Sequence, residues 1–229
     1  MAKKEKIVVI SLGGSLIVPH HVDWKYVKYF CSYVEKLSWT YKTVIVCGGG
    51  SLAREYITAL QHETHKVKVL SYIGIGATKL NARLVSGFLE DVSVVAETMD
   101  DVVSQLNKQR IVVCGALGFK PNMTSDGTAA EIAVALDGWF VNLTNVRGLY
   151  DKDPQKYKTA TFIPVISYED FLRMALDQKY HAGQHFVLDQ VAAQLIAKHT
   201  IPTAIIEGNK LPEVAKFLAD KPFSGTRIG

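Results

Sequence analysis

Residues 43–56, which read TVIVCGGGSLAREY, decide the fold class of this chain. The first five are apolar or β-branched and predict a short strand that is buried on both faces. A helical pattern begins at Ser51, and three glycines separate it from the strand. A strand that runs through glycines into a helix presents backbone N–H groups and a helix dipole to an anion. The stretch therefore predicts an α/β unit with a phosphate site, to which Arg54 can add a bidentate guanidinium.

The same alternation extends along the chain in both directions. Strand-like runs are expected at 7–12, 43–47, 92–96, 110–114, 139–143 and 202–206. Helical patterns are expected at 22–37, 51–61, 72–89, 100–106, 128–136, 168–176, 187–199 and 211–218. Wholly apolar strands that alternate with helices predict an open, mainly parallel sheet covered by helices on both faces. Because the 229 residues contain no linker-like segment, we expect one domain with two lobes.

Composition and charge restrict the function classes. The formal net charge is +4 and the charges are scattered, which suits a small anionic ligand and argues against a nucleic-acid partner. The apolar run at 7–12 is too short for a signal sequence or a membrane span, so we expect a cytoplasmic protein without a membrane partner. Cys31, Cys47 and Cys114 lack zinc-type spacing and are expected to be buried free thiols in a reducing compartment.

Ligands of open sheets bind beyond the carboxyl ends of the strands, and three loops there carry polar chemistry. The first, 13–15, is either a tight turn or an amide cradle for an anion, and the second is the glycine triplet. In the third, 115–126, Thr124 or Ser125 either caps the following helix or helps to hold a phosphate. Neither a Walker A sequence nor a dinucleotide fingerprint occurs, so the phosphate site belongs to a fold other than the P-loop and Rossmann folds.

A polar and aromatic cluster follows the strand expected at 139–143. In it, Tyr150 can lie against a base while Thr144, Asn145 and Asp153 bond phosphate, ribose or a base edge. The alternative is a turn-rich loop.

Seven segments together resemble the amino-acid kinase superfamily, and specifically its archaeal-type uridylate kinases. In chain order they are SLGGS (11–15), CGGGSLAREY (47–56), IGIGATKLNA (73–82), TSDGTAAEIA (124–133), LTNVRGLYDKDP (143–154), HAGQHFVLDQVAAQLI (181–196) and SGTRIG (224–229). The resemblance implies a three-layer α/β/α sandwich with an acceptor-binding N-lobe at about 1–137 and an ATP-binding C-lobe at about 138–229. It also implies transfer of the ATP γ-phosphoryl group to UMP, giving ADP and UDP for pyrimidine nucleotide biosynthesis.

The resemblance implies roles for individual positions. The ATP-binding positions are Gly14, Ser15, Gly50, Thr144, Asn145, Tyr150 and Asp153. The UMP-binding positions are Gly49, Arg54, Ser71, Leu117, Gly118, Lys120, Asn122 and Thr124. The last five lie in an acceptor loop, 117–124, that is longer than in relatives. The positions expected to take part in catalysis are Gly14, Ser15, Gly50, Arg54, Lys120 and Asp189.

Four positions depart from the family pattern. Ser11 stands where many members have a lysine that neutralises the transferring phosphoryl group, and Ser51 stands where some have a second lysine. Ser71 replaces an aspartate on the acceptor ribose, and Arg147 replaces another aspartate. Lys120, in the long loop, is the candidate for the missing positive charge, and a solvated loop lysine is the alternative.

Two further features remain open in the sequence. Asp189 matches a family aspartate near the active centre, but it also suits a helix start. His181 and His185 have helical spacing without a recognisable third ligand, so they are expected to be ordinary surface or loop histidines and no protein-held metal is predicted.

Phosphoryl transfer requires alignment of donor and acceptor and neutralisation of charge, usually with Mg²⁺ on the donor phosphates. UMP already carries a nucleophilic phosphate oxygen, so no general base is expected. The alternatives are a kinase of another small acceptor, such as isopentenyl phosphate, acetylglutamate or carbamate, and a non-catalytic nucleotide- or anion-binding protein. Related uridylate kinases assemble as hexamers, so the resemblance implies a homo-oligomer.

Overall fold

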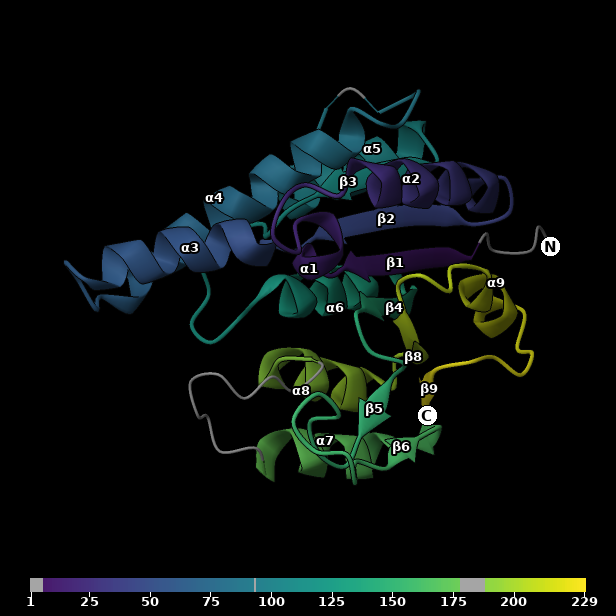
Figure 1. Ribbon diagram of the computed structural model, residues 1–229. Coiled ribbons are helices and arrows are strands. Elements are labelled where there is room, and N and C mark those ends of the chain that lie inside the picture. Colours follow the sequence, from purple (N-terminus) through teal and green to yellow (C-terminus); the bar gives the residue numbers. More distant parts are fainter. Residues whose placement is uncertain (1–5, 93, 178–187) are drawn as a thin grey trace.

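The computed structural model describes residues 6–92, 94–177 and 188–229. Within these ranges, a seven-stranded sheet in the order β3-β2-β1-β4-β8-β9-β7 runs through the molecule with helices on both sides (Figure 1). Its strands are β1 (Ile7–Leu12), β2 (Lys42–Cys47), β3 (Ile111–Cys114), β4 (Trp139–Thr144), β7 (Val165–Ile166), β8 (Thr203–Glu207) and β9 (Thr226–Ile228). A separate hairpin pairs β5 (Leu149–Tyr150) with β6 (Phe162–Ile163).

The described helices cover the sheet or extend from it. They are α1 (Gly14–Ile17), α2 (Trp24–Ser38), α3 (Gly50–Gln61), α4 (Val67–Ser86), α5 (Met99–Lys108), α6 (Ser125–Leu136), α7 (Tyr168–Asp177), α8 (Gln190–His199) and α9 (Pro212–Leu218). None of the helices in the described ranges combines the length and apolar character that a bilayer span requires.

The central strands are parallel. Leu12 at the end of β1 pairs with Cys47 of β2 on one side and with Leu143 of β4 on the other. The β8–β9 pair is antiparallel, whereas β7 and β9 are parallel again. This arrangement confirms the predicted open, mainly parallel sheet and brings the loops after β1, β2, β3 and β4 to one edge.

Two apolar cores lie on opposite faces of the sheet. Alternate residues of β1 divide between them: Val8 and Ile10 face the core under α2, α4 and α9, and Val9 faces the core under α5, α6, α7 and α8. Because the central strands are buried on both sides, most positions in them are apolar, and Asn142 of β4 is a buried polar exception. The two cores confirm the predicted three-layer sandwich.

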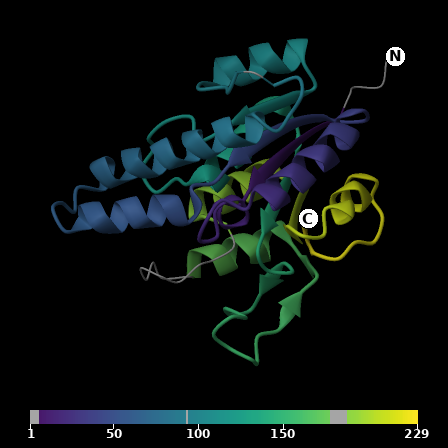
Figure 2. The same ribbon diagram turned by 45° about the horizontal axis from the view of Figure 1, so that its top comes forward.

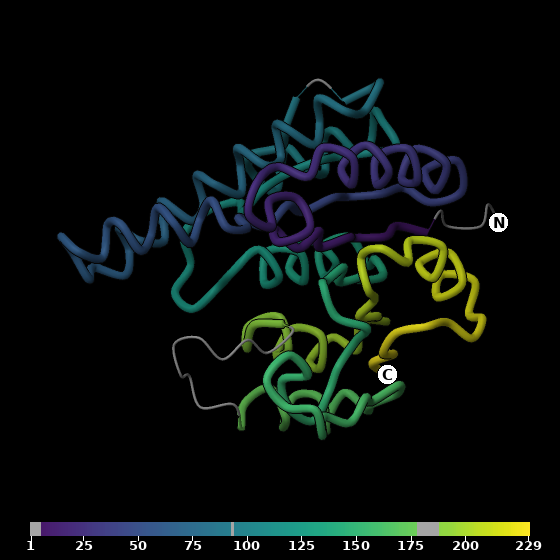
Figure 3. The backbone as a smooth tube through the Cα atoms, viewed as in Figure 1, coloured from purple at the N-terminus to yellow at the C-terminus, as the bar shows by residue number. Residues whose placement is uncertain are grey.

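Helices α3 and α4 pack side by side and project beyond the sheet as an arm (Figure 2). The chain path shows the loop between β3 and α6 swinging out beneath this arm before it returns to α6 (Figure 3).

Some predicted elements are wrong. Of the strand expected at 92–96, the described residues form only an isolated bridge between Ala96 and Cys114. Helix α4 begins at Val67 instead of Tyr72, because its first turns stand on the arm, where exposed Val67 and Val69 show no core-facing periodicity. The strands β7 and β9 contain only two and three residues, too few for a periodic pattern.

Candidate active site

The first two glycine loops are in direct backbone contact. A Cβ atom added to Gly14 would lie 2.0 Å from the amide nitrogen of Gly50 and 2.7 Å from the carbonyl carbon of Gly48. Gly50 adopts a left-handed φ of +66°, and a Cβ there would lie 2.4 Å from the carbonyl oxygen of Gly14. Only glycine fits these contacts, and the adjacent parallel strands β1 and β2 bring the two loops together.

A buried asparagine holds the second loop in place. The Nδ2 atom of Asn81, on α4, donates to the carbonyl oxygens of Gly48 at 2.7 Å and Gly49 at 3.2 Å. Sequence reasoning missed Asn81, although a polar side chain in the middle of a helical segment was the available signal. The start of α3, by contrast, has no side-chain cap. The amide of Ser51 donates to the carbonyl oxygen of Val18 at 3.0 Å, and the positive end of the helix dipole faces the loop region. Arg54, one turn further, is exposed on the same helix.

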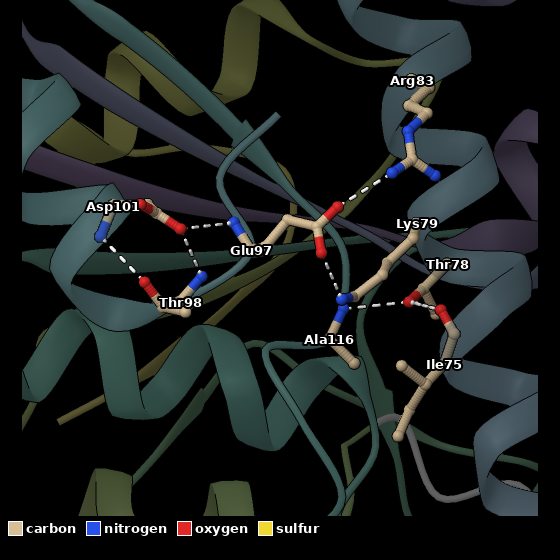
Figure 4. A network of polar contacts seen from close by, with 8 residues as sticks. All are labelled: Ile75, Thr78, Lys79, Arg83, Glu97, Thr98, Asp101 and Ala116. Atoms are coloured by element: carbon tan, nitrogen blue, oxygen red, sulfur yellow. Dashed lines mark hydrogen bonds and ion pairs between the residues drawn. The ribbon is translucent and has the colours of Figure 1, made fainter. Parts of the chain in front are cut away.

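The third loop begins beside α4. The hydroxyl of Thr78 accepts from the amide of Ala116 at 2.9 Å and donates to the carbonyl of Ile75 at 2.7 Å (Figure 4). A Cβ on Gly115 would lie 2.7 Å from the Thr78 hydroxyl, so this glycine allows the loop to approach the helix closely. The loop after β3 is thus fixed on α4 next to the glycine triplet.

An ion-pair network braces the same part of α4. Lys79 and Arg83 both contact the carboxylate of Glu97, at 2.9 and 2.8 Å (Figure 4). The hydrogen bond from Lys79 is the largest of the effects that lower the pKa of Glu97. Thr98 and Asp101 form a capping box at the start of α5, so the network ties α4 to the N-terminus of α5.

Asp189 caps two helices at once. One carboxylate oxygen accepts from the amide of Ala192 at 2.7 Å and caps α8. The other accepts from the amides of Thr124 and Gly127, each at 3.0 Å, and from the Thr124 hydroxyl. The structure therefore places Asp189 and Thr124 in the helix-capping arrangement, and the roles in catalysis and UMP binding predicted for them stay predictions.

A partly buried carboxyl group, that of Asp126, lies beside the first loop. The Ser11 hydroxyl, 1% exposed at the end of β1, donates to Oδ1 of Asp126 at 2.6 Å. Burial, and next the charge of Asp189, raise the pKa of Asp126 to about 7, and the Ser11 hydrogen bond opposes this shift. Sequence reasoning missed Asp126, and its place in the first turn of α6, within the TSDGTAAEIA segment, was the available signal.

A cavity of about 210 Å³ lies where the first loop meets the carboxyl ends of β4 and β8. Its lining combines predicted ATP-binding residues with others: Ser15, Leu16, Pro19, Asp23, Tyr26, Thr144, Asn145, Glu207, Gly208 and Asn209. The fold thereby brings Ser15 next to Thr144 and Asn145, which lie about 130 positions away in the chain.

Four of the predicted ATP-binding residues lie outside the lining of this cavity: Gly14 and Gly50, which are at the contact between the first two loops, and Tyr150 and Asp153. Tyr150, in β5, packs edge-on against Phe162 with ring centroids 5.6 Å apart. The carboxylate of Asp153 accepts from the amide of Gln155 at 2.9 Å and shapes the following turn. Their contacts with a nucleotide stay predictions.

The remaining predicted UMP-binding residues lie along the acceptor loop and on α4. The ammonium group of Lys120 pairs with the Glu131 carboxylate of α6 at 2.6 Å, and both side chains are partly exposed. Gly118 and Asn122 have φ values of 155° and 59°, so two left-handed residues allow this loop to turn. Leu117 packs against the core beneath α6, and Ser71 is half-buried on α4.

The described residues contain no group of three or more His, Cys, Asp or Glu side chains suited to a metal ion. His181 and His185 lie outside the described residues. Cys31, Cys47 and Cys114 are buried free thiols, as predicted.

Comparisons with known proteins agree with this geometry. The model of the amino acid kinase family matches residues 6–207. The chain is 32% identical over 208 residues to the uridylate kinase of Methanoregula boonei, covering 90% of this chain and 88% of that protein. It is also 32% identical over 224 residues to the uridylate kinase of Thermoplasma volcanium, covering 96% of each.

Solved structures share the same arrangement. The crystal structure of uridylate kinase from Archaeoglobus fulgidus has a TM-score of 0.85 and 30% identity, covering 97% of this chain and 100% of that one. The UMP kinase from Ureaplasma parvum, at 21% identity and a TM-score of 0.78, shares the fold.

Proposed function

The chain belongs to the amino acid kinase family, and on that premise we propose that it transfers the γ-phosphoryl group of ATP to UMP, giving ADP and UDP. The main observation is that three glycine-containing loops, after β1, β2 and β3, lie together at one edge of the sheet. The N-terminus of α3, which has no side-chain cap, lies among them. Backbone amides and a helix dipole at that point suit the phosphates of a donor and an acceptor. Archaeal relatives called uridylate kinase, which align over nearly the whole chain, support UMP as the acceptor.

In this proposal the two substrates approach the contact between Gly14 and Gly50 from opposite sides. The C-lobe, about 138–229, binds ATP, with the cavity beside Thr144 and Asn145 leading to the phosphates at Gly14 and Ser15. The N-lobe, about 1–137, binds UMP against Gly49, Arg54 and the loop 117–124. A phosphate oxygen of UMP attacks the γ-phosphorus, and the bond from this phosphorus to the β–γ bridging oxygen breaks.

The chain's own residues act by position and charge. The glycine amides face the phosphoryl oxygens without intervening side chains, and Arg54 clamps the acceptor phosphate. Tyr150 and Asp153 complete the ATP site from the β5 side, while Lys120 exchanges its Glu131 partner for the transferring group. No proton needs to be removed, because the attacking phosphate oxygen is already charged at neutral pH.

We also propose that Mg²⁺ enters with ATP. Mg²⁺ usually keeps several water ligands and binds through one or two carboxylates together with substrate phosphates. Asp126, beside the end of β1, would supply a carboxylate oxygen directly or through water. When bound, the ion neutralises charge on the donor phosphates.

The test is a coupled ADP-release assay with Mg-ATP and a panel of acceptors: UMP, CMP, AMP, isopentenyl phosphate, acetylglutamate and carbamate. We expect the highest kcat/KM for UMP. A higher value for another acceptor would replace UMP with that acceptor, and the absence of turnover with all of them would favour a nucleotide- or anion-binding protein.

Arg54→Ala provides the residue-level test. Loss of a charge-assisted hydrogen bond should lower kcat/KM for UMP about ten- to hundredfold while the KM for ATP changes little. The matched control is Lys28→Ala, which removes an exposed cation from α2. An unchanged dependence on UMP concentration in Arg54→Ala would remove this residue from the acceptor site.

We further propose a cytoplasmic homo-oligomer. Three buried cysteines without disulfides support a reducing compartment. Exposed Val69 and Leu80, which are about three turns apart on one face of α4, support a self-association surface. Light scattering after size-exclusion chromatography measures the assembly, and a monomeric mass would refute it.

A further inference from the structure

One carboxylate joins the N-termini of two helices. Oδ1 of Asp189 accepts from the amide of Ala192 at 2.7 Å, in the first turn of α8. Oδ2 accepts from the amides of Thr124 and Gly127, each at 3.0 Å, and from the Thr124 hydroxyl, at the start of α6. Helix N-termini carry partial positive charge, so an anion between these two ends stabilises their side-by-side arrangement. Asp189 is therefore more than the cap of its own helix.

Small side chains let the two helices come close enough to share this carboxylate. Helices α6 and α8 pack directly against each other, and their buried alanines belong to one apolar core: Ala129, Ala130, Ala133, Ala192 and Ala193. Gly127 adds to the close approach, because a Cβ atom there would lie 3.2 and 3.3 Å from the two Asp189 oxygens. The packing of α6 on α8 thus fixes where the carboxylate lies.

The turn that Asp189 holds connects the acceptor loop with the first glycine loop. The predicted acceptor loop, 117–124, ends at Thr124, the N-cap of α6. Asp126, in the same turn, accepts from the Ser11 hydroxyl, which lies near the end of β1 just before the first glycine loop. After burial, the charge of Asp189 is the second cause that raises the pKa of Asp126, so the two carboxyl groups lie close together. A displaced Asp189 would therefore move Asp126 and the end of the acceptor loop together.

We propose that Asp189 is a positioning residue for phosphoryl transfer. By holding the first turn of α6, its carboxylate keeps Asp126 and the end of the acceptor loop in place beside the first glycine loop. This inference rests on the proposed function, in which the donor phosphates lie at the first glycine loop and the acceptor lies against the loop 117–124. Asp189 acts through α6 and contacts neither substrate, so its loss disturbs the alignment of the reactants more than their binding.

The kinetic experiment compares wild type with Asp189→Asn. Asparagine is as good an N-cap as aspartate but has one acceptor oxygen, so it can serve only one of the two helices. The kcat and the KM values for ATP and UMP are measured on the full chain at a temperature below the unfolding transition. We expect kcat to fall about ten- to hundredfold, while both KM values change by less than about twofold.

A double-mutant cycle with Thr124→Val distinguishes positioning from direct contact with the reacting groups. Valine has the shape of threonine without the hydroxyl that donates to Asp189. This variant alone should lower kcat about threefold, because the two backbone contacts of α6 remain. If Asp189 acts through the first turn of α6, the double variant should have the kcat of Asp189→Asn within about twofold. If Asp189 acts on the substrates independently of this turn, the losses of the two single variants should multiply.

Amide hydrogen exchange measures the same role without turnover. Residues 124–127 should exchange faster in Asp189→Asn than in wild type, because their hydrogen bonds to the carboxylate are lost. The matched control is Ser167→Ala, which removes the hydroxyl that accepts from the amide of Asp170 at 3.1 Å at the start of α7. The control should lower the unfolding temperature but keep the wild-type kcat and the wild-type exchange at 124–127.

Distinct results separate the inference from its premise. A kcat of Asp189→Asn near that of wild type would overturn the inference, and so would multiplying losses in the double variant or unchanged exchange at 124–127. Failure of wild-type protein to phosphorylate UMP would instead refute the proposed function. The exchange comparison would still decide whether Asp189 holds the first turn of α6.

Discussion

Replacing Asp126 with asparagine should remove a pH dependence from the stability of the protein. Burial, and next the charge of Asp189, raise the pKa of Asp126 from 3.8 to about 7 in the folded protein. The folded state therefore keeps a proton that the unfolded chain releases between about pH 4 and pH 7. Stability from this group is fully present below the unfolded pKa and is lost as the pH rises through the folded pKa.

The magnitude follows from that interval. About three pH units at 1.36 kcal/mol per unit give roughly 4 kcal/mol over the whole range. Between about pH 5 and about pH 8, the part accessible to experiment, the loss is roughly 3 kcal/mol. The unfolding free energy of a typical domain is about 5–15 kcal/mol, so this loss is a large fraction of it.

The assay is urea unfolding of the unliganded protein at both pH values. The unfolding free energy of Asp126→Asn minus that of wild type should increase by roughly 3 kcal/mol from the acidic to the alkaline condition. Ser11→Ala serves as the control, because it removes the hydrogen bond that opposes the shift and should raise the pKa of Asp126 further. A difference between Asp126→Asn and wild type that stays constant with pH would refute this explanation.

Three other substitutions test the site. Gly14→Ala should lower kcat/KM about a hundredfold or more, since its Cβ would lie 2.0 Å from the amide of Gly50; activity near wild type would contradict the close packing of the loops. Asn81→Ala should cost about 1–3 kcal/mol in urea unfolding by leaving the buried carbonyl of Gly48 unpaired, and an unchanged midpoint would argue against it. Lys120→Met should lower kcat and kcat/KM together with ATP affinity retained, and Ser11→Lys in that background should restore part of the rate. Full activity of Lys120→Met would leave Lys120 as a surface ion-pair residue.

The sequence by itself determined the fold class and the edge of the sheet that carries the site. Apolar runs such as 43–47 have to be buried on both faces, and the glycines that follow them mark where strands end. Helix caps could be predicted equally well, as Thr124 shows, because the hydrogen bonds of a cap join neighbours in the chain. The resemblance to uridylate kinases added the expectation of which loops bind ATP and which bind the acceptor.

Only the tertiary structure decided which distant groups meet. The hydrogen bond between Ser11 and Asp126 spans 115 positions, and the contact of Tyr72 with Phe119 joins a helix to a loop. The strand expected at 92–96 was wrong because its apolar residues suit a strand or a partly exposed loop equally well, and pairing alone distinguishes them. Periodicity records how each segment relates to its own neighbours, whereas contacts, burial and the pKa of Asp126 depend on segments that the fold brings together from far along the chain.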